Sequence, residues 1–200
     1  MKLILASKSP RRKEILEKTG FQITIEPSGF CEKKTEKFNK IEEIENLIKY
    51  NSEGKAKEVF ERINSEALVI GADTVVILEC VCMNKPRNSS EAFLCLKNLS
   101  GCSHLVKTAV SVAGANGVIS KIDTSEVFFR KLNDVEIEKY IKEKNPLDKA
   151  GSYGIQDFIK EDLKINKDSF IQKIDGSYYN IMGICPEFLK KVIKEYEKLN

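Results

Sequence analysis

Asp73 is the residue of this 200-residue chain whose surroundings point most clearly to chemistry. It lies in Ala67–Leu78, an otherwise apolar run that predicts a central strand. An ionised carboxylate in such a strand must be paired, hydrogen-bonded or bound to a metal, because burying it alone costs several kcal/mol. The strand by itself leaves two interpretations open, a functional carboxylate and a structural aspartate at a strand end.

The start of the chain predicts a second functional element. Leu3–Ala6 is apolar and too short for a helix, and Ser9 followed by Pro10 is typical of a helix start. Arg11 and Arg12 then fall in the first helical turn, where the helix dipole disfavours cations. A bound anion would offset this, since free backbone N–H groups and guanidinium forks together form a phosphate site. Two solvated arginines are the alternative interpretation.

A loop after Pro146 has the composition of a binding segment. Residues 148–156 contain two glycines, a serine and a tyrosine, and they end with Gln156. Such a loop offers backbone donors and a side-chain amide that could read a base edge. The chain contains neither a P-loop pattern nor a Gly-x-Ser-x-Gly elbow, so neither P-loop nor serine-hydrolase chemistry is expected.

Other polar candidates are individually weak. Lys55 falls on a predicted helix, Lys85 precedes Pro86, and Glu32 lies in a polar loop, where solvent exposure is the default for all three. His104, the only histidine, cannot build a histidine-rich metal site, and a structural hydrogen-bonding role is expected for it.

Composition and charge narrow the class of protein. The chain is 42% hydrophobic and 32% charged, as in globular proteins, and its net charge of +3 argues against a nucleic-acid-binding face. No apolar run is long enough to span a membrane, and no signal peptide is recognisable, so a cytoplasmic protein is expected. The six cysteines form no Cys-x-x-Cys pair, which predicts reduced and mostly buried thiols.

Hydrophobic periodicity predicts interleaved strands and helices, with a hairpin at Asn116–Gly117 and another at Asp175–Gly176. The helix expected between Ile41 and Ile63 is either continuous or divided at Gly54. These patterns indicate an α/β protein with a mixed sheet. Further strands are expected at 22–26, 80–84, 105–113 and 118–132, and further helices begin at 88, 133 and 186.

Several segments taken together resemble the Maf family of nucleoside triphosphate pyrophosphatases. They occur in the family's order from residue 3 to about residue 186, so the resemblance covers nearly the whole chain. The matching segments are Leu5-Ala6-Ser7-Lys8-Ser9-Pro10-Arg11-Arg12, Gly71-Ala72-Asp73-Thr74-Val75, Lys85-Pro86, Leu99-Ser100-Gly101 with His104, Pro146 through Gln156, and Asp175-Gly176-Ser177-Tyr178-Tyr179 with Met182-Gly183.

The resemblance implies a fold and an activity. The fold would be one domain over residues 1–200, with an elongated mixed sheet flanked by helices and two lobes around a central cleft. The activity would be hydrolysis of a nucleoside triphosphate between its α and β phosphates, giving a nucleoside monophosphate and pyrophosphate. It would require a divalent cation, Mg²⁺ or Mn²⁺. The resemblance also suggests a homodimer.

The resemblance assigns roles to individual residues. It makes Asp73 the catalytic base and a metal ligand, with Glu32 as a second metal ligand. The combination of Arg12, Thr74 and Gln156 is similar to that of the family branch selective for dTTP and UTP. The positions matching phosphate contacts are Ser7, Arg11, Arg12, Lys55 and Lys85.

Two departures from the family pattern keep alternatives open. Cys31 stands where the family often has a second acid before Glu32, and residues 157–168 look like an insertion beside the base pocket. One alternative keeps the chemistry but takes modified or purine nucleotides as substrates. Another is a nucleotide-binding regulatory module that acts on a protein partner in growth or division.

Overall fold

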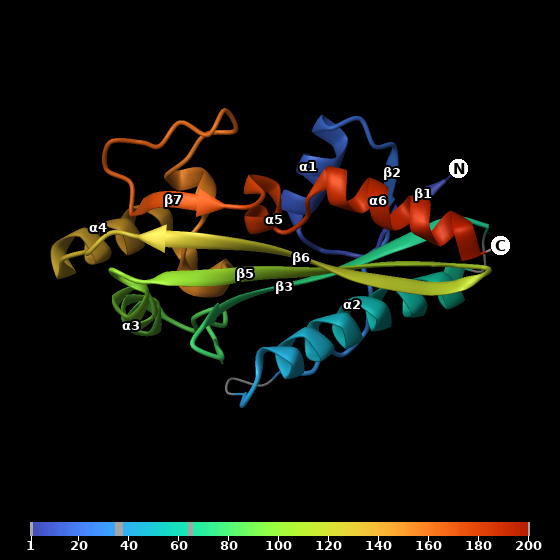
Figure 1. Cartoon of the computed structure of the whole chain (residues 1–200), viewed down its shortest axis with the longest axis horizontal. Coiled ribbons are helices and arrows are strands. Elements are labelled where there is room, and N and C mark those ends of the chain that lie inside the picture. The colour runs from blue at the N-terminus through green and yellow to red at the C-terminus, as the bar shows by residue number, and fades with distance from the viewer. Residues whose placement is uncertain (1, 35–37, 64–65, 200) are drawn as a thin grey trace.

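A single mixed sheet runs the length of this elongated molecule (Figure 1). The computed structural model describes residues 2–34, 38–63 and 66–199. Its seven strands have the order β2-β1-β3-β5-β6-β7, with β4 paired to β3. The strands are β1 (Leu3–Leu5), β2 (Ile23–Ile25), β3 (Leu68–Leu78), β4 (Val81–Cys82), β5 (Ser103–Gly114), β6 (Gly117–Phe129) and β7 (Ile171–Asp175).

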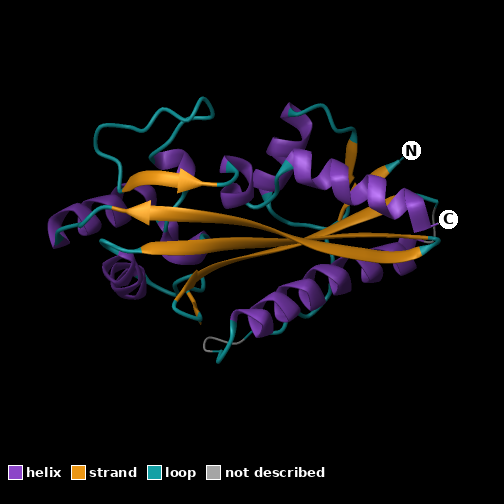
Figure 2. Cartoon of the chain, in the orientation of Figure 1, coloured by secondary structure: helices purple, strands orange, loops and turns teal. Residues whose placement is uncertain are grey.

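The helices cover both faces of this sheet (Figure 2). Helix α2 lies along one face against β3 and β5, and α1, α5 and α6 lie on the other (Figure 1). The α-helices are α1 (Pro10–Lys18), α2 (Ile41–Ile63), α3 (Ser89–Leu99), α4 (Asp134–Lys144), α5 (Tyr178–Met182) and α6 (Pro186–Tyr196), with short 3-10 turns at Pro146–Asp148, Ala150–Ser152, Ile155–Asp157 and Glu197–Leu199.

Separate hydrophobic cores form the two ends of the molecule. At one end Leu5 of β1, Leu16 of α1 and Leu189 of α6 belong to one core. At the other end a core that includes Leu96 and Ile137 lies among α3, α4 and β7. Strands β3, β5 and β6 connect the two ends, so the predicted α/β architecture with a mixed sheet is confirmed.

The partial pairing of β3 creates the opening in which the site lies. Strand β1 runs parallel to β3 only as far as Leu5 opposite Ile70, and Ala6 N donates the last bond, to Ile70 O. The next described backbone partner on that side is Met83 N, which donates to Val76 O. Between Ile70 and Val76 the edge of β3 is therefore available to side chains and ligands, while its other edge stays paired with β5.

The structure decides one open alternative and corrects two predictions about the fold. Helix α2 is continuous and is not divided at Gly54, where a Cβ would lie 2.2 Å from Cζ of Phe30, so the glycine leaves room for that ring. Asp175–Gly176 joins a strand to a helix instead of forming a hairpin, because Ser177 caps α5 by accepting from Asn180 N. The six cysteines are all free, as predicted, but only Cys82, Cys95 and Cys185 are buried.

Candidate active site

The cavity at the open edge of β3 has a volume of about 720 Å³ and takes its walls from both ends of the molecule. Volumes of this size are typical of small-molecule sites. The two-lobed arrangement with a central cleft is therefore present. The lining includes most of the residues predicted from the sequence to form the site: Arg11, Arg12, Glu32, Lys55, Asp73, Thr74, Lys85 and Gln156.

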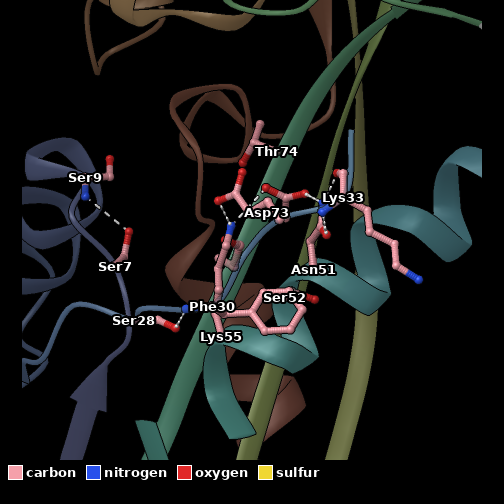
Figure 3. A network of polar contacts seen from close by, with 12 residues as sticks. Ser7, Ser9, Ser28, Phe30, Lys33, Asn51, Ser52, Lys55, Asp73 and Thr74 are labelled. Atoms are coloured by element: carbon pink, nitrogen blue, oxygen red, sulfur yellow. Dashed lines mark hydrogen bonds and ion pairs between the residues drawn. The ribbon is translucent and has the colours of Figure 1, made fainter. Parts of the chain in front are cut away.

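Lys55 is one of the charged residues that line this cavity, and its side chain reaches Asp73 (Figure 3). Its Nζ donates to Glu32 Oε1 at 2.7 Å, to Asp73 Oδ1 at 3.0 Å and to Ala72 O at 3.1 Å. The Lys55 side chain is 10% exposed and that of Asp73 15%, whereas Glu32 is 41% exposed. Asp73 is thus a paired, half-buried carboxylate that faces the cavity.

One face of α2 holds the loop that carries Glu32. Asn51 accepts from Lys33 N at 2.9 Å and donates to Lys33 O at 3.0 Å, and its Nδ2 also donates to Asp73 Oδ2 at 3.0 Å. Further along the helix, Gly54 leaves room for the ring of Phe30. Positions three or four apart share a helix face, which explains how one face contacts both the loop and the strand.

A third anchor from the same helix completes the docking of this loop. Glu58 accepts from Ser28 Oγ at 2.6 Å and from Gly29 N at 2.9 Å. The loop is therefore held at three successive positions of α2, and Glu32 is brought to the same lysine that pairs with Asp73.

The electrostatics of Glu32 favour its ionised form. Burial raises the pKa of Glu32, but its hydrogen bond to Lys55 and the charges of Lys55, Lys85 and Lys34 outweigh this effect and hold the pKa below its usual value. The exposed side chain of Lys85 therefore acts on the same site.

The donor set fits a divalent cation shared with a ligand. Glu32 and Asp73 offer carboxylate oxygens, which Mg²⁺ and Mn²⁺ prefer. Among the described residues, no group of three or more His, Cys, Asp and Glu side chains is arranged to hold a metal ion. A cation here would thus depend on oxygen atoms of substrate and water, as Mg²⁺ commonly does at phosphate sites.

Arg12 is buried and largely committed to the protein itself. Its Nε donates to Gly183 O at 3.0 Å, its Nη1 to Ala72 O at 2.9 Å and to Ser7 Oγ at 3.3 Å, and its Nη2 to Thr74 Oγ1 at 2.9 Å. Burial lowers the pKa of this guanidinium, and the carboxylates of the site oppose that effect. Ser7 does not line the cavity; it supports Arg12 instead.

Arg11 and Gln156 approach the cavity from opposite ends of the molecule. Arg11 Nη1 lies 2.6 Å from Asp148 Oδ2, so this predicted phosphate contact joins α1 to the loop before Gln156. Gln156 is exposed and lies over Gly154, where a Cβ would stand 2.6 Å from its Nε2. Residues 157–168 do not line the cavity, although they directly follow Gln156, which does.

His104 has the structural role expected from the sequence. It is 2% exposed, and its Nε2 lies 2.8 Å from the hydroxyl of Tyr153, itself buried. Burial lowers the pKa of His104 to about 4, and Nδ1 is buried without a hydrogen-bond partner among the described residues. The ring is therefore neutral near pH 7.

Sequence reasoning missed Asn51, which contacts both Asp73 and the Glu32 loop. The available signal was its position four residues before Lys55, because this spacing places both side chains on one helix face. Lys149 was also missed as a candidate; it lines the cavity and pairs with Asp148 at 2.7 Å.

This chain belongs to the family described as "Maf-like protein", whose profile matches residues 2–196. Curated relatives carry a more specific name. A "dTTP/UTP pyrophosphatase" of Clostridium perfringens (strain 13 / Type A) is 39% identical over 202 residues, which cover 98% of each chain. The protein of that name from Bacillus pumilus (strain SAFR-032) is 42% identical over 182 residues, 91% of this chain and 89% of its own.

One solved structure overlaps the chain only loosely. A nucleoside-triphosphatase, also titled dITP/XTP pyrophosphatase, from Mycobacterium abscessus superposes with a TM-score of 0.39 at 14% identity, over 64% of this chain and 73% of its own. That likeness is too weak to inform the site. In the part of the chain that the structure describes, no helix is long and apolar enough to cross a membrane.

Proposed function

We propose that this protein is a nucleoside triphosphate pyrophosphatase that acts on dTTP and UTP. Water attacks the α phosphorus, the bond from the α phosphorus to the bridging oxygen breaks, and pyrophosphate leaves the nucleoside monophosphate. The observation that carries the proposal is the meeting of Lys55, Glu32 and Asp73 in the cavity of a chain that matches dTTP/UTP pyrophosphatases over nearly its full length.

The residues of the site divide the work of this reaction. Lys55, Lys85, Lys149 and Arg11 supply positive charge for a triphosphate, and such electrostatic positioning accounts for most of phosphoryl-transfer catalysis. Asp73 is the carboxylate within the cavity that takes a proton from the attacking water. Asn51 and Lys55 fix the orientation of that carboxylate through one oxygen each.

Glu32 and Asp73 would together hold a divalent cation, Mg²⁺ or Mn²⁺, that neutralises charge on the triphosphate. The remaining oxygen ligands would come from the substrate and from water. The exposure of Glu32 leaves its carboxylate accessible to an entering metal–nucleotide complex.

A panel of nucleoside triphosphates, assayed for pyrophosphate with and without a divalent cation, tests the proposal. The expected result is cation-dependent pyrophosphate release that is fastest with dTTP and UTP. Asp73→Asn should abolish turnover and retain nucleotide binding. Wild-type turnover in Asp73→Asn, or faster release from purine or modified nucleotides, would contradict the proposal. Tight binding of a triphosphate without any product would instead favour a regulatory binding module.

A further inference from the structure

We propose that Thr108, which does not line the cavity, sets the hydrogen-bonding direction of Thr74 and so makes the site selective for an imide base over cytosine. This inference rests on the function proposed above. Thr74 lies on the face of β3 opposite Asp73, because neighbouring residues of a strand point to opposite faces. Thr74 lines the cavity there, beside Arg12 and Gly183.

Thr74 and Thr108 are direct partners on β3 and β5. Their Oγ1 atoms lie 3.0 Å apart, and either hydroxyl could be the donor on distance alone. Thr108 is fully buried. Its hydroxyl has a second partner, Asn180 O, to which it donates at 3.3 Å.

The surrounding contacts determine the direction of these hydrogen bonds. Arg12 Nη2 can only donate, so Thr74 Oγ1 accepts from it at 2.9 Å. A carbonyl can only accept, so the single proton of Thr108 is directed to Asn180 O. The proton of Thr74 then goes to Thr108 Oγ1 at 3.0 Å, because the other acceptor in reach, Gly183 O, is farther away at 3.4 Å.

With its own proton directed into the protein, Thr74 offers only a lone pair to the cavity. Arg12 uses four of its five N–H groups in the bonds described above, which leaves one N–H on Nη2, the nitrogen bonded to Thr74. An acceptor and a donor on neighbouring groups complement the N–H and C=O of an imide. Uracil and thymine carry that imide, whereas cytosine presents an unprotonated ring nitrogen at the same place.

The test compares kcat/KM for UTP and CTP in the wild type, Thr108→Val and Thr108→Ser. Valine keeps the shape of threonine but removes the acceptor of the Thr74 proton, so that this proton can turn toward a cytosine nitrogen. The UTP/CTP ratio should fall about tenfold in Thr108→Val, the effect of losing one directed hydrogen bond in a buried site. Thr108→Ser keeps the hydroxyl and should keep the ratio.

Each outcome bears on a different claim. A wild-type enzyme that prefers UTP, together with an unchanged ratio in Thr108→Val, would overturn the role of Thr108 and leave the proposed function intact. A wild type that releases pyrophosphate from neither UTP nor dTTP would overturn both.

A thermal melt establishes that each variant is folded. Thr108→Ala, which removes the hydroxyl without adding a methyl group, replaces Thr108→Val if that variant does not fold. A loss of rate that is equal for both nucleotides would indicate a purely structural role and contradict the proposal.

Discussion

Arg11 Nη1 lies 2.6 Å from Asp148 Oδ2, and this ion pair joins the first helix to the loop that leads to Gln156. Arg11 and Lys149 are the cations nearest to Asp148, which pairs with both. Burial raises the pKa of Asp148, but hydrogen bonds from Lys149 and Arg11 outweigh it and lower the pKa to about 2. The carboxylate is therefore ionised at any ordinary assay pH, and a triphosphate must compete with it for Arg11.

Removing that competitor should tighten substrate binding. Asp148→Asn leaves Arg11 and Lys149 free for phosphate, so we expect KM for the triphosphate to fall about two- to fivefold, a range typical of an exposed ion pair. The free energy of unfolding should fall by no more than about 1 kcal/mol, the upper end for exposed ion pairs. Steady-state kinetics and thermal denaturation measure the two effects. A rise in KM would show that Asp148 positions Arg11 instead of competing for it.

Lys55 should stabilise the folded protein as well as serve the reaction. Lys55→Met leaves the carboxylates of Glu32 and Asp73 without their shared cation, and we expect a loss of about 2–3 kcal/mol in stability. Millimolar Mg²⁺ should raise the melting temperature of this variant more than that of the wild type, and EDTA should reverse the gain. Lys57→Met, on an exposed part of the same helix, is the matched control. Equal responses to Mg²⁺ in both variants would argue against a cation site at these carboxylates.

Asn51 should matter for the cation more than for the nucleotide. Asn51→Leu removes both bonds to the Lys33 backbone and the bond to Asp73, so the Glu32 loop loses the one of its three α2 contacts that also touches Asp73. We expect the cation concentration needed for half-maximal activity to rise about tenfold, while KM for the nucleotide at saturating cation changes less. Asn46→Leu, at an exposed position of α2, should change neither quantity. Parallel increases in both constants would refute a specific link to the cation.

The buried histidine gives the protein a defined acid sensitivity. Because burial lowers the pKa of His104 to about 4, the unfolded chain binds this proton below about pH 6.5 whereas the folded protein does not. Stability should therefore fall as the pH drops from about 6.5 to about 4, by up to ~3 kcal/mol from this residue. Denaturant unfolding across that range should show a shallower decline for His104→Gln. The same slope in both proteins would exclude His104 as the cause.

Local signals predicted those elements whose boundaries depend on neighbouring residues. Ser9 caps α1 through Arg12 N, and Asn133 and Glu136 form the capping box of α4, as their spacing indicates. The hairpin predicted at Asp175–Gly176 is wrong, because the same dipeptide occurs both in hairpins and in strand-to-helix turns. Besides the local cap from Ser177, a distant strand fixes this turn: Ser177 N donates to Ser125 Oγ at 2.9 Å, and a Cβ at Gly176 would stand 2.6 Å from that oxygen.

The candidate site shows the same division between local and distant information. The cavity contains Asp73 and Lys85, as motif matching anticipates. Ser7 lies outside its lining, because its partner is the guanidinium of Arg12, and no local pattern indicates where that side chain lies. Helix propensity makes Gly54 a weak point of α2. The reason for a glycine there is the ring of Phe30, from a separate loop, which occupies the space that a Cβ would fill.

The carbonyl oxygen of Ala72 receives Lys55 from one face of the sheet and Arg12 from the other. The carboxylate side of the cleft, through Lys55, and the Thr74 side, through Arg12, are thus linked by this one oxygen atom. A movement of either cation changes the electrostatic environment of the other. Because this acceptor belongs to the main chain, replacing the alanine methyl group would leave it in place. The two halves of the cleft are therefore uncoupled by a shift in the path of the strand or by the loss of one of the two cations, and not by a change of the Ala72 side chain.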